Sequence, residues 1–181
     1  LAVLTSGEEL AQASVQQGTR TLTVAKGRGM IYDRSLTPLV GTETFYRASV
    51  IPTEPAVQAA VRLVPESAPM ILEMARQRTP FTLEVPVRHV YARDVQVFEV
   101  VKRYCDPGIA PHLVGYTDAA GDRGLSGIEK AYDAYLTGVG KSVTVSYRAN
   151  VIGDPVEGAY PTIEQSGYPV REGIVLTLDA Q

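Results

Sequence analysis

The sequence holds no serine in the pattern that a serine acyl-transfer enzyme needs. In the Ser-x-x-Lys pattern, the lysine lies one helical turn from the nucleophile and is placed to accept its proton. None of the serines in this chain is followed three residues later by lysine, and Gly-x-Ser-x-Gly is absent. Residues 141–143 (Lys-Ser-Val) begin like a Lys-Thr-Gly element but lack its glycine. We therefore expect no catalytic residue in this chain.

Metal-binding and phosphate-binding patterns are equally weak. His89 and His112 stand alone, with no cysteine or histidine at ligand spacing. Asp118 and Asp122 flank a glycine, but the calcium-loop pattern Asp-x-Asp-x-Asp-Gly is missing, so turn formation explains them better. Residues 27–29 (Gly-Arg-Gly) are a fragment of a glycine-rich phosphate loop without its lysine, and we interpret them as a tight turn. The sequence predicts no metal and no cofactor.

The composition describes an ordinary globular chain with a slight negative charge. Hydrophobic residues make up 45% of the sequence and charged residues 20%, which is enough for a packed core. The formal net charge is −3 and no run of five like charges occurs. This balance gives no support to nucleic-acid binding or to a polybasic membrane patch. Cys105 is the single cysteine, so the chain forms no internal disulfide, and we interpret it as a partly buried apolar side chain.

Hydrophobic periodicity predicts a mixed set of helices and strands. Val57, Ala60, Val61 and Val64 have helical spacing, and Pro65 ends that pattern. The order lacks a regular β-α-β alternation, so the sequence predicts the α+β class. The predicted helices cover 7–18, 57–64, 67–77 and 126–138, with a helical turn over 109–114; the predicted extended segments cover 21–24, 30–34, 43–51, 81–87, 95–102, 142–151 and 174–178.

Two strands show a clear period of two. In residues 81–87 the apolar side chains alternate onto one face, and Pro86 cannot donate a ladder hydrogen bond, so we expect an edge strand. In residues 142–151 the odd-numbered side chains are apolar or aromatic and face one way. Residues 54–115 contain helices and strands of their own, which predicts a subdomain inserted between extended segments.

A cluster of charges occupies residues 28–34, and Glu129 is a candidate partner far along the chain. The guanidinium of Arg34 is a planar fork that suits a carboxylate. In a local loop these charges would be solvated and would contribute little to stability. Glu129 has a second candidate role, because Ser126 lies three residues earlier and the two fit a helix capping box. Spacing alone leaves these alternatives open.

Four sequence motifs resemble those of class B penicillin-binding proteins, in the order of that family. Residues 28–34 (Arg-Gly-Met-Ile-Tyr-Asp-Arg) are similar to the signature Arg-Gly-x-Ile-x-Asp-Arg-Asn-Gly that follows the membrane anchor. Residues 112–116 (His-Leu-Val-Gly-Tyr) and 124–133 (Gly-Leu-Ser-Gly-Ile-Glu-Lys-Ala-Tyr-Asp) resemble two further elements. Residues 173–181 resemble the segment that leads into the transpeptidase domain. The chain departs from the signature at residues 35–36, where Ser-Leu replaces Asn-Gly, and we expect Thr37-Pro38 to supply the turn.

The resemblance implies an α+β fold in which an extended, β-rich stem carries an inserted α/β head. It assigns residues 1–53 to the first part of the stem, 54–115 to the head, and 116–181 to the second part of the stem, which leads to a missing C-terminal transpeptidase domain. It also implies that Arg34 and Glu129 approach each other across the base of this pedestal. The structural motif residues are Arg28, Gly29, Asp33, Arg34, Gly124, Gly127 and Glu129.

The resemblance further implies a non-catalytic role in bacterial cell-wall synthesis. Such a pedestal lifts a serine D,D-transpeptidase, the penicillin-binding domain, away from the membrane. Implied partners are the chain's own C-terminal transpeptidase domain, a polytopic glycan-polymerising membrane protein and other wall-synthesis proteins. The implied location is the extracytoplasmic face of the cell membrane, held by a single N-terminal anchor that this chain lacks. Elongation, division and sporulation members share these motifs; residues 103–106 (Arg-Tyr-Cys-Asp) resemble a Gram-positive, clostridial-type sequence.

Two other functions are compatible with parts of the sequence. A free-standing extracytoplasmic module that binds wall glycan, peptide or a protein partner is the main alternative, although ten tyrosines and no tryptophan do not favour sugar stacking. A small hydrolase with serine and histidine is the other, but neither histidine accompanies a nucleophile motif. Saturable binding of wall fragments would support the first, and a serine-directed label on this chain would support the second.

Overall fold

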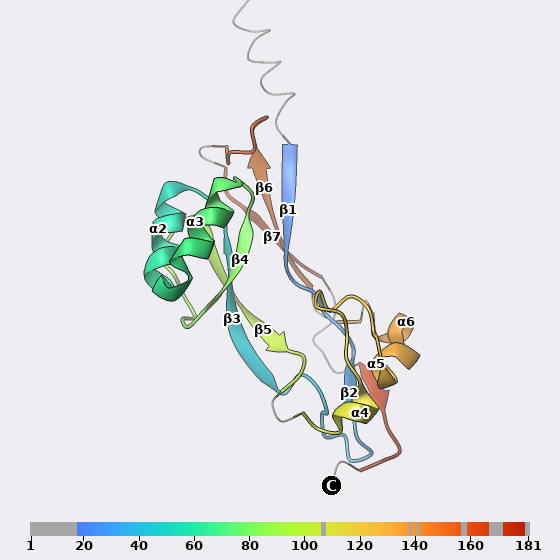
Figure 1. Cartoon of the computed structure of the whole chain (residues 1–181). Helices are drawn as coiled ribbons and strands as arrows, with labels where there is room; N and C mark the ends of the chain where they lie inside the picture. The colour runs from blue at the N-terminus through green and yellow to red at the C-terminus, as the bar shows by residue number, and fades with distance from the viewer. Residues whose placement is uncertain are drawn as a thin grey trace, which may run out of the picture. The chain divides into compact units, whose positions relative to one another are not determined.

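A computed structural model describes residues 18–105, 108–137, 139–140, 142–156, 159–166 and 172–179 (Figure 1). The helix predicted over 7–18 lies outside these residues. Within the described ranges, no helix has both the length and the apolar character that crossing a membrane requires.

The mixture of helices and strands confirms the predicted α+β class. Three small sheets form, with strand orders β1-β6-β7, β4-β3-β5 and β2-β8, and the last pair is parallel. In chain order the elements are β1 (Gly18–Ala25), β2 (Met30–Tyr32), β3 (Glu43–Val50), α2 (Glu54–Leu63), a 3-10 turn (Pro65–Ser67), α3 (Ala68–Arg76), β4 (Phe81–Val85), β5 (Val95–Lys102), α4 (Pro111–Val114), α5 (Gly127–Ala131), α6 (Asp133–Leu136), β6 (Ser142–Ala149), β7 (Thr162–Ser166) and β8 (Gly173–Val175).

The chain divides into two compact units. The first unit takes in Leu1–Leu22, Ala48–Val97 and Val145–Ile163. The second unit takes in Thr23–Arg47, Phe98–Thr144 and Glu164–Gln181. The predicted division into stem and head at residues 54 and 115 stays a prediction.

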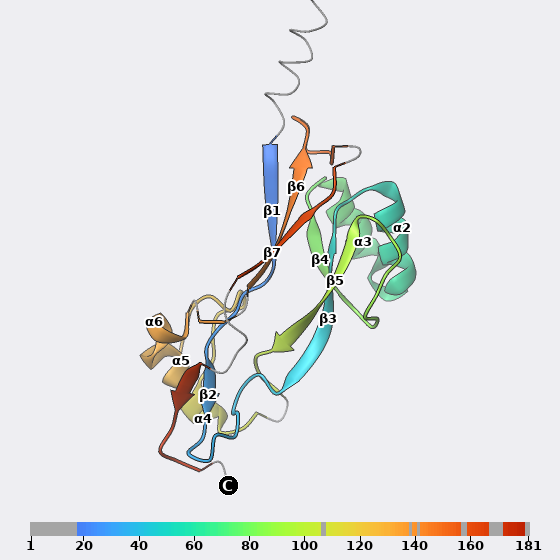
Figure 2. The same ribbon diagram turned by 180° about the vertical axis from the view of Figure 1, so that it is seen from behind.

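Two helices of the first unit form where the periodicity predicts them. Glu54 and Pro55 open α2, since a proline in the first turn gives up no intrahelical hydrogen bond and its fixed φ suits a helix. Of the residues predicted at helical spacing, Ala60 and Val64 are buried and Val57 and Val61 are partly buried, while Ala56 adds a buried position that the pattern did not include. Helix α3 lies within the predicted range 67–77, and its Ile71 is fully buried. Helices α2 and α3 lie side by side, and α3 is the nearer of the two to β4 in both views (Figures 1 and 2).

Strand β4 confirms the predicted alternation and the predicted edge position. Phe81, Leu83 and Val85 are buried, and the side chains between them are not. The strand stops before Pro86 and lies at the edge of the sheet, with β3 as its neighbour. A proline is tolerated there because the edge position needs no further ladder donor.

Strand β6 alternates as predicted but ends earlier than predicted. Its buried side chains run from Val143 to Ala149 at every second residue. Val151 was expected on the same face, yet it is exposed, because the chain turns at Asn150. The side-chain oxygen of Asn150 accepts hydrogen bonds from the backbone N–H groups of Ile152 and Asp154, an arrangement that asparagine favours in turns. Strand β7 was not predicted, because all of its side chains are exposed and show no apolar pattern.

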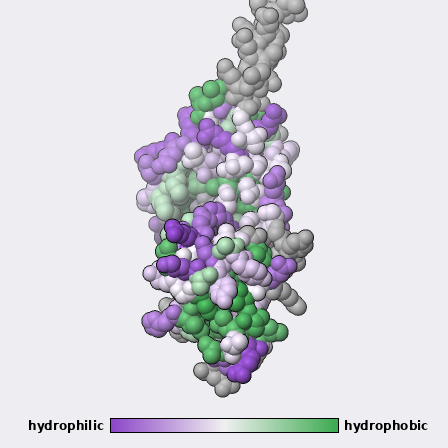
Figure 3. Space-filling model, turned by 90° about the vertical axis from the view of Figure 1, so that its right-hand side faces the viewer, coloured by the Kyte–Doolittle hydropathy of each residue, from purple (hydrophilic) through white to green (hydrophobic). Residues whose placement is uncertain are grey.

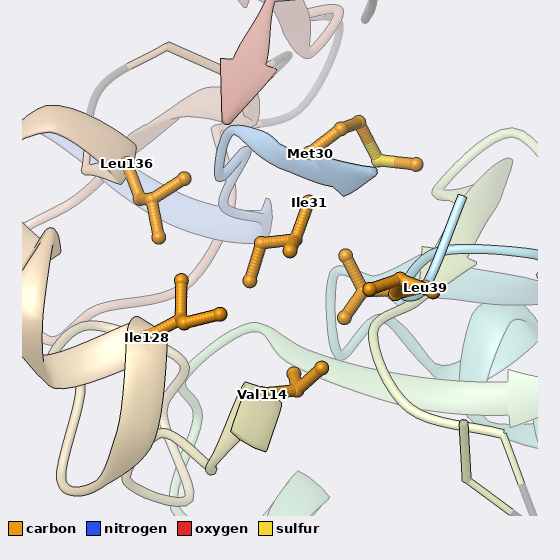
Figure 4. Packing of buried hydrophobic residues seen from close by; sticks show 7 residues of the cluster. Met30, Ile31, Leu39, Val114, Ile128 and Leu136 are labelled. Atoms are coloured by element: carbon orange, nitrogen blue, oxygen red, sulfur yellow. The ribbon is translucent and has the colours of Figure 1, made fainter. Parts of the chain in front are cut away.

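The second unit is built around one hydrophobic cluster drawn from distant segments (Figure 4). Strands β2 and β8 pair in register, with Met30 opposite Gly173 and Ile31 opposite Ile174. The predicted final strand over 174–178 is therefore shorter, and Leu178 is exposed. The buried members of the cluster are Met30, Ile31, Leu39, Val40, Val114, Ile128 and Leu136.

The single helix predicted over 126–138 is wrong. Two short helices, α5 and α6, are separated at Tyr132, where φ is −116°. Helical spacing puts Ile128, Tyr132 and Tyr135 on one face of such a helix; Ile128 is buried, but Tyr132 and Tyr135 are about half exposed. Ile128 and Leu136 both face the cluster. The break lets both short helices present a buried side chain to the same core.

Candidate functional site

A buried ion pair between Arg28 and Glu129 lies at the centre of the second unit. The backbone places Arg28 opposite Thr137 in an isolated antiparallel bridge, next to α6. The Arg28 Nε donates to Glu129 Oε2 at 2.6 Å, and the two side chains are 5% and 0% exposed. The neighbouring Gly29 N–H donates to the Leu136 carbonyl at 2.8 Å. The predicted tight turn at residues 27–29 is therefore wrong, because this segment lies extended against the end of α6.

Both terminal nitrogens of Arg28 also find partners. Nη2 donates to the Glu129 carbonyl at 2.9 Å and to Asp133 Oδ1 at 2.7 Å. Nη1 donates to Thr137 Oγ1 at 2.8 Å. Arginine thus ties the bridge strand to both α5 and α6 through its planar array of donors.

Glu129 binds a second arginine and a tyrosine through its other oxygen. Arg103 Nε donates to Glu129 Oε1 at 2.8 Å, and the Tyr104 hydroxyl donates to the same oxygen at 3.0 Å. Arg103 Nη1 also donates to the Gly29 carbonyl at 2.6 Å. The carboxylate is therefore held from both sides, as a buried charge must be. Sequence reasoning missed both partners, because nothing in their spacing connects residues 103–104 with residue 129.

The charges in this network shift the pKa values of three groups. Burial disfavours the charged form of Arg28, but hydrogen bonds to Glu129 and Asp133 outweigh it and raise the pKa. The backbone N–H of Gly124 and then Arg28 lower the pKa of Asp133. Burial raises the pKa of Tyr104, a hydrogen bond with Thr117 opposes that rise, and the nearby charge of Glu129 adds to it. At neutral pH Arg28 and Asp133 are therefore charged and Tyr104 is protonated.

The expected pair between Arg34 and Glu129 does not form. Arg34 Nη2 donates to Asp179 Oδ2 at 2.5 Å instead, in a largely exposed pair. Six residues separate Arg34 from Arg28, and extended chain of that length covers roughly 20 Å. Strand β2 therefore places Arg34 away from Glu129 and next to residues 178–179. There the backbone N–H of Arg34 donates to the Leu178 carbonyl.

The capping box between Ser126 and Glu129 is also absent. Ser126 makes no capping hydrogen bond, and its hydroxyl accepts from the Tyr116 N–H at 3.2 Å. The carboxylate of Glu129 is committed to the two arginines. Ion pairing in the interior outweighs a cap because an unpaired buried arginine would cost more than an uncapped helix end.

Asp33 builds the turn in which the chain departs from the family signature. Its Oδ1 accepts from the N–H groups of Ser35 at 2.9 Å and Thr37 at 2.7 Å. Leu36 has φ of +64°, the left-handed conformation that glycine adopts without strain. The expectation that Thr37-Pro38 would supply the turn is correct in part: the Thr37 carbonyl accepts from the Asp33 N–H at 2.9 Å and Pro38 pairs with Tyr32, while the Asp33 side chain and the left-handed Leu36 complete the turn.

Gly124 and Gly127 have no room for a side chain. A Cβ on Gly124 would overlap the carbonyl of Glu129. Gly127 has φ of +56°, and a Cβ there would lie 2.5 Å from the Leu113 carbonyl. These motif glycines allow α4, α5 and the loop between them to approach within backbone contact.

The other candidate residues take surface or turn positions. His89 and His112 are both exposed. Asp118 accepts from the Asp122 N–H at 2.8 Å, which confirms the predicted turn. Cys105 is half buried, with its sulfur 2.6 Å from Thr42 Oγ1. In the part of the chain that the structure describes, no group of three His, Cys, Asp or Glu side chains is placed to hold a metal ion.

The network has the chemistry of a structural centre. Both oxygens of the carboxylate already accept hydrogen bonds, so Glu129 is not placed to take a proton from a substrate. No serine or cysteine hydroxyl or thiol is recorded in hydrogen-bond contact with the Arg28–Glu129 pair within the described residues. What the arrangement does is join three segments that are remote in the sequence, residues 28–29, 103–104 and 129–137.

Comparison with known proteins gives a structural likeness. No family model and no curated protein matches the chain. A solved peptidoglycan synthetase from Bifidobacterium adolescentis ATCC 15703 is 20% identical, with a TM-score of 0.51 over 90% of this chain and 37% of that one. The chain has the fold of part of a peptidoglycan synthetase. A complex between a penicillin-binding protein (PBP2) and MreC from Helicobacter pylori is also similar, at 16% identity and a TM-score of 0.46, over 90% of this chain and 37% of that one. The chain thus spans about 37% of the length of each solved chain.

Proposed function

We propose that this chain is the non-catalytic pedestal of a membrane-anchored class B penicillin-binding protein, a serine D,D-transpeptidase of cell-wall synthesis. Its task would be to hold the transpeptidase domain away from the membrane and to offer surfaces to other wall-synthesis proteins. The fold shared with part of a peptidoglycan synthetase supports this reading, as does the lack of a nucleophile motif in the sequence.

The observation that carries the proposal is the meeting of all four sequence motifs in the second unit. Arg28 of the first motif binds Glu129 of the third. Gly127 of the third motif packs against Leu113 of the second. The fourth motif pairs with the first through β8 and β2. Residues that match the family therefore join the chain together, which is the expected role of motif residues in a support domain.

The surface of the second unit supports a further domain next to it. In Figure 3 apolar side chains gather over part of the surface of the second unit. Val175 in β8 and Leu178 shortly after it are about half exposed, and so is Leu125. Apolar area of this kind on a protein surface marks contact with another body. We propose that the chain's own transpeptidase domain covers it.

The sequence of the gene on both sides of this chain tests the proposal. We expect an upstream apolar span of about 20 residues, which is the length that crosses a bilayer as a helix. Downstream we expect Ser-x-x-Lys, Ser-x-Asn and Lys-Thr-Gly elements. A reading frame that stops directly after Gln181 would contradict the pedestal role and leave a free-standing binding module as the function to test.

A further inference from the structure

The turn over residues 33–38 of the second unit presents an exposed leucine in a strained conformation. Leu36 has φ of +64°, and its side chain is 65% exposed. Positive φ is unfavourable for leucine, because its Cβ crowds the following carbonyl oxygen, a contact that glycine does not make. This is the position at which leucine replaces the glycine of the class B signature. The turn needs no side chain here, so the turn alone does not explain the leucine.

Hydrogen bonds on both sides of Leu36 hold it in this conformation. The Asp33 carboxylate accepts from the N–H groups of Ser35 and Thr37. The Leu36 N–H donates to the Asp33 carbonyl at 3.1 Å, and the Asp33 N–H donates to the Thr37 carbonyl at 2.9 Å. Strained residues persist where the neighbouring structure fixes them, and they are concentrated at sites of binding and contact. The turn therefore holds an apolar side chain out towards solvent in a defined position.

The same turn binds the last described residues of the chain. The Arg34 N–H donates to the Leu178 carbonyl at 3.0 Å, and the Ser35 hydroxyl donates to Asp179 Oδ1 at 3.3 Å. Leu178 is itself 56% exposed. Asp179 lies two residues before Gln181, and two extended residues cover about 7 Å. Whatever follows Gln181 in the same polypeptide therefore begins close to this turn.

We propose that Leu36 packs against an apolar patch of the domain that follows Gln181 in the same polypeptide. The inference rests on the proposed function, which places a transpeptidase domain there. Leu36 and Leu178 are too small a surface for a separate protein, because stable interfaces between separate proteins bury about 1,200–2,000 Å². A covalently connected domain needs less, since the connection raises its effective concentration up to the millimolar range. The strained leucine is then kept for its side chain, which the interface uses.

The test is limited proteolysis of the full-length protein of the natural gene, labelled with fluorescent penicillin. Cleavage between the two domains releases a smaller labelled fragment. At low protease concentration its rate follows the population in which the domains are apart. Leu36→Asn removes the apolar side chain and introduces a residue that tolerates positive φ. This variant should be cleaved about tenfold faster or more, the factor that corresponds to losing the burial of one leucine.

Matched variants separate docking from general effects. Leu36→Met keeps an apolar side chain of similar volume, so its cleavage rate should stay within about twofold of the original protein. Val151→Asn makes the same kind of change in a turn of the first unit, at a side chain that is 67% exposed, and should leave the rate unchanged. In the 181-residue chain, Leu36→Asn should melt no lower than the original, because it relieves strain. Faster cleavage of the full-length variant will then not reflect unfolding.

Penicillin labelling distinguishes a failure of this inference from a failure of the proposed function. Every variant should take the label like the original protein, because neither substituted residue belongs to the domain that binds penicillin. Cleavage of labelled Leu36→Asn at the original rate would overturn the docking of Leu36 and leave the pedestal role in place. Cleavage of Leu36→Met or Val151→Asn as fast as Leu36→Asn would overturn it as well. A full-length protein without a penicillin-labelled domain after residue 181 would overturn both.

Discussion

Glu129 in the second unit and Tyr147 in the first unit are both buried polar side chains, but their surroundings differ. Glu129 is bound on both carboxylate oxygens by Arg28, Arg103 and Tyr104. Tyr147 has a hydroxyl without a partner in the described residues. Removing one member of a satisfied buried pair is costly, whereas an unsatisfied hydroxyl already costs stability where it stands. The difference predicts opposite effects on stability when the polar group of each side chain is removed.

Glu129→Ala should have the largest effect on stability. It leaves Arg28 and Arg103 buried without their shared carboxylate, and breaking a buried pair in this way costs about 3–5 kcal/mol. Urea unfolding followed by circular dichroism measures the change. Asp179→Ala is the matched control, because it removes the exposed partner of Arg34 and should cost less than about 1 kcal/mol. Equal stability of both variants and the original chain would refute the structural role of Glu129.

Gly124→Ala should have the next largest effect. The added methyl group overlaps the Glu129 carbonyl, so α5 must shift, at a cost of about 1–3 kcal/mol. Gly18→Ala serves as the control, since the space around that position is open. Thermal unfolding of the two variants compares the sites directly. A Gly124→Ala melting temperature as high as that of Gly18→Ala would mean that the close approach is not required.

Removing single tyrosine hydroxyls should change stability in opposite directions. Tyr104→Phe takes a donor from the buried Glu129 and should lower the free energy of unfolding by about 1.5–3 kcal/mol. Tyr147→Phe removes an unsatisfied group and should raise it by about 1 kcal/mol. The same urea experiment measures both. A loss of stability in Tyr147→Phe would show that its hydroxyl has a structural partner.

The strained turn at Leu36 gives a prediction of stabilisation. Positive φ at Leu36 lowers the free energy of unfolding by about 1–2 kcal/mol through strain. Glycine removes the strain, but it loses more conformational entropy on folding, which lowers the free energy of unfolding by about 0.5–1 kcal/mol. Leu36→Gly should therefore raise the free energy of unfolding by about 1 kcal/mol. Ser35→Gly, where φ is not positive, should lower it. The prediction fails if Leu36→Gly melts below the original chain.

The smallest expected effect is a change in pH dependence. The folded-state pKa of Asp133 lies below its ordinary value of 3.8, first through the Gly124 N–H and then through Arg28. Its contribution to stability is complete above the unfolded pKa and is lost as pH falls through the folded pKa, because the unfolded chain binds the proton first. Asp133→Asn should flatten the slope of unfolding free energy below about pH 4. An unchanged acid slope in this variant would exclude Asp133 as its source.

The elements were largely predictable from sequence, and the tertiary partners were not. Period-two patterns located β4 and β6, and helical spacing located α2 and α3. Strand β7 was not predicted, because its side chains are all exposed and show no alternation of apolar and polar residues. The choice of Arg28 over Arg34 as the partner of Glu129 depends on the path of β2, which spacing does not encode. Arg103 and Tyr104 came from a third segment that no local signal connects to Glu129.

Labelling with fluorescent penicillin tests the central claim of this account most directly. The full-length protein of the natural gene is labelled, digested and separated, and the position of the label is mapped. The pedestal role predicts that the label lies downstream of residue 181 and that the 181-residue chain alone takes none. Label within residues 1–181, or none on the full-length protein, would contradict the assignment of this chain as the support of a transpeptidase.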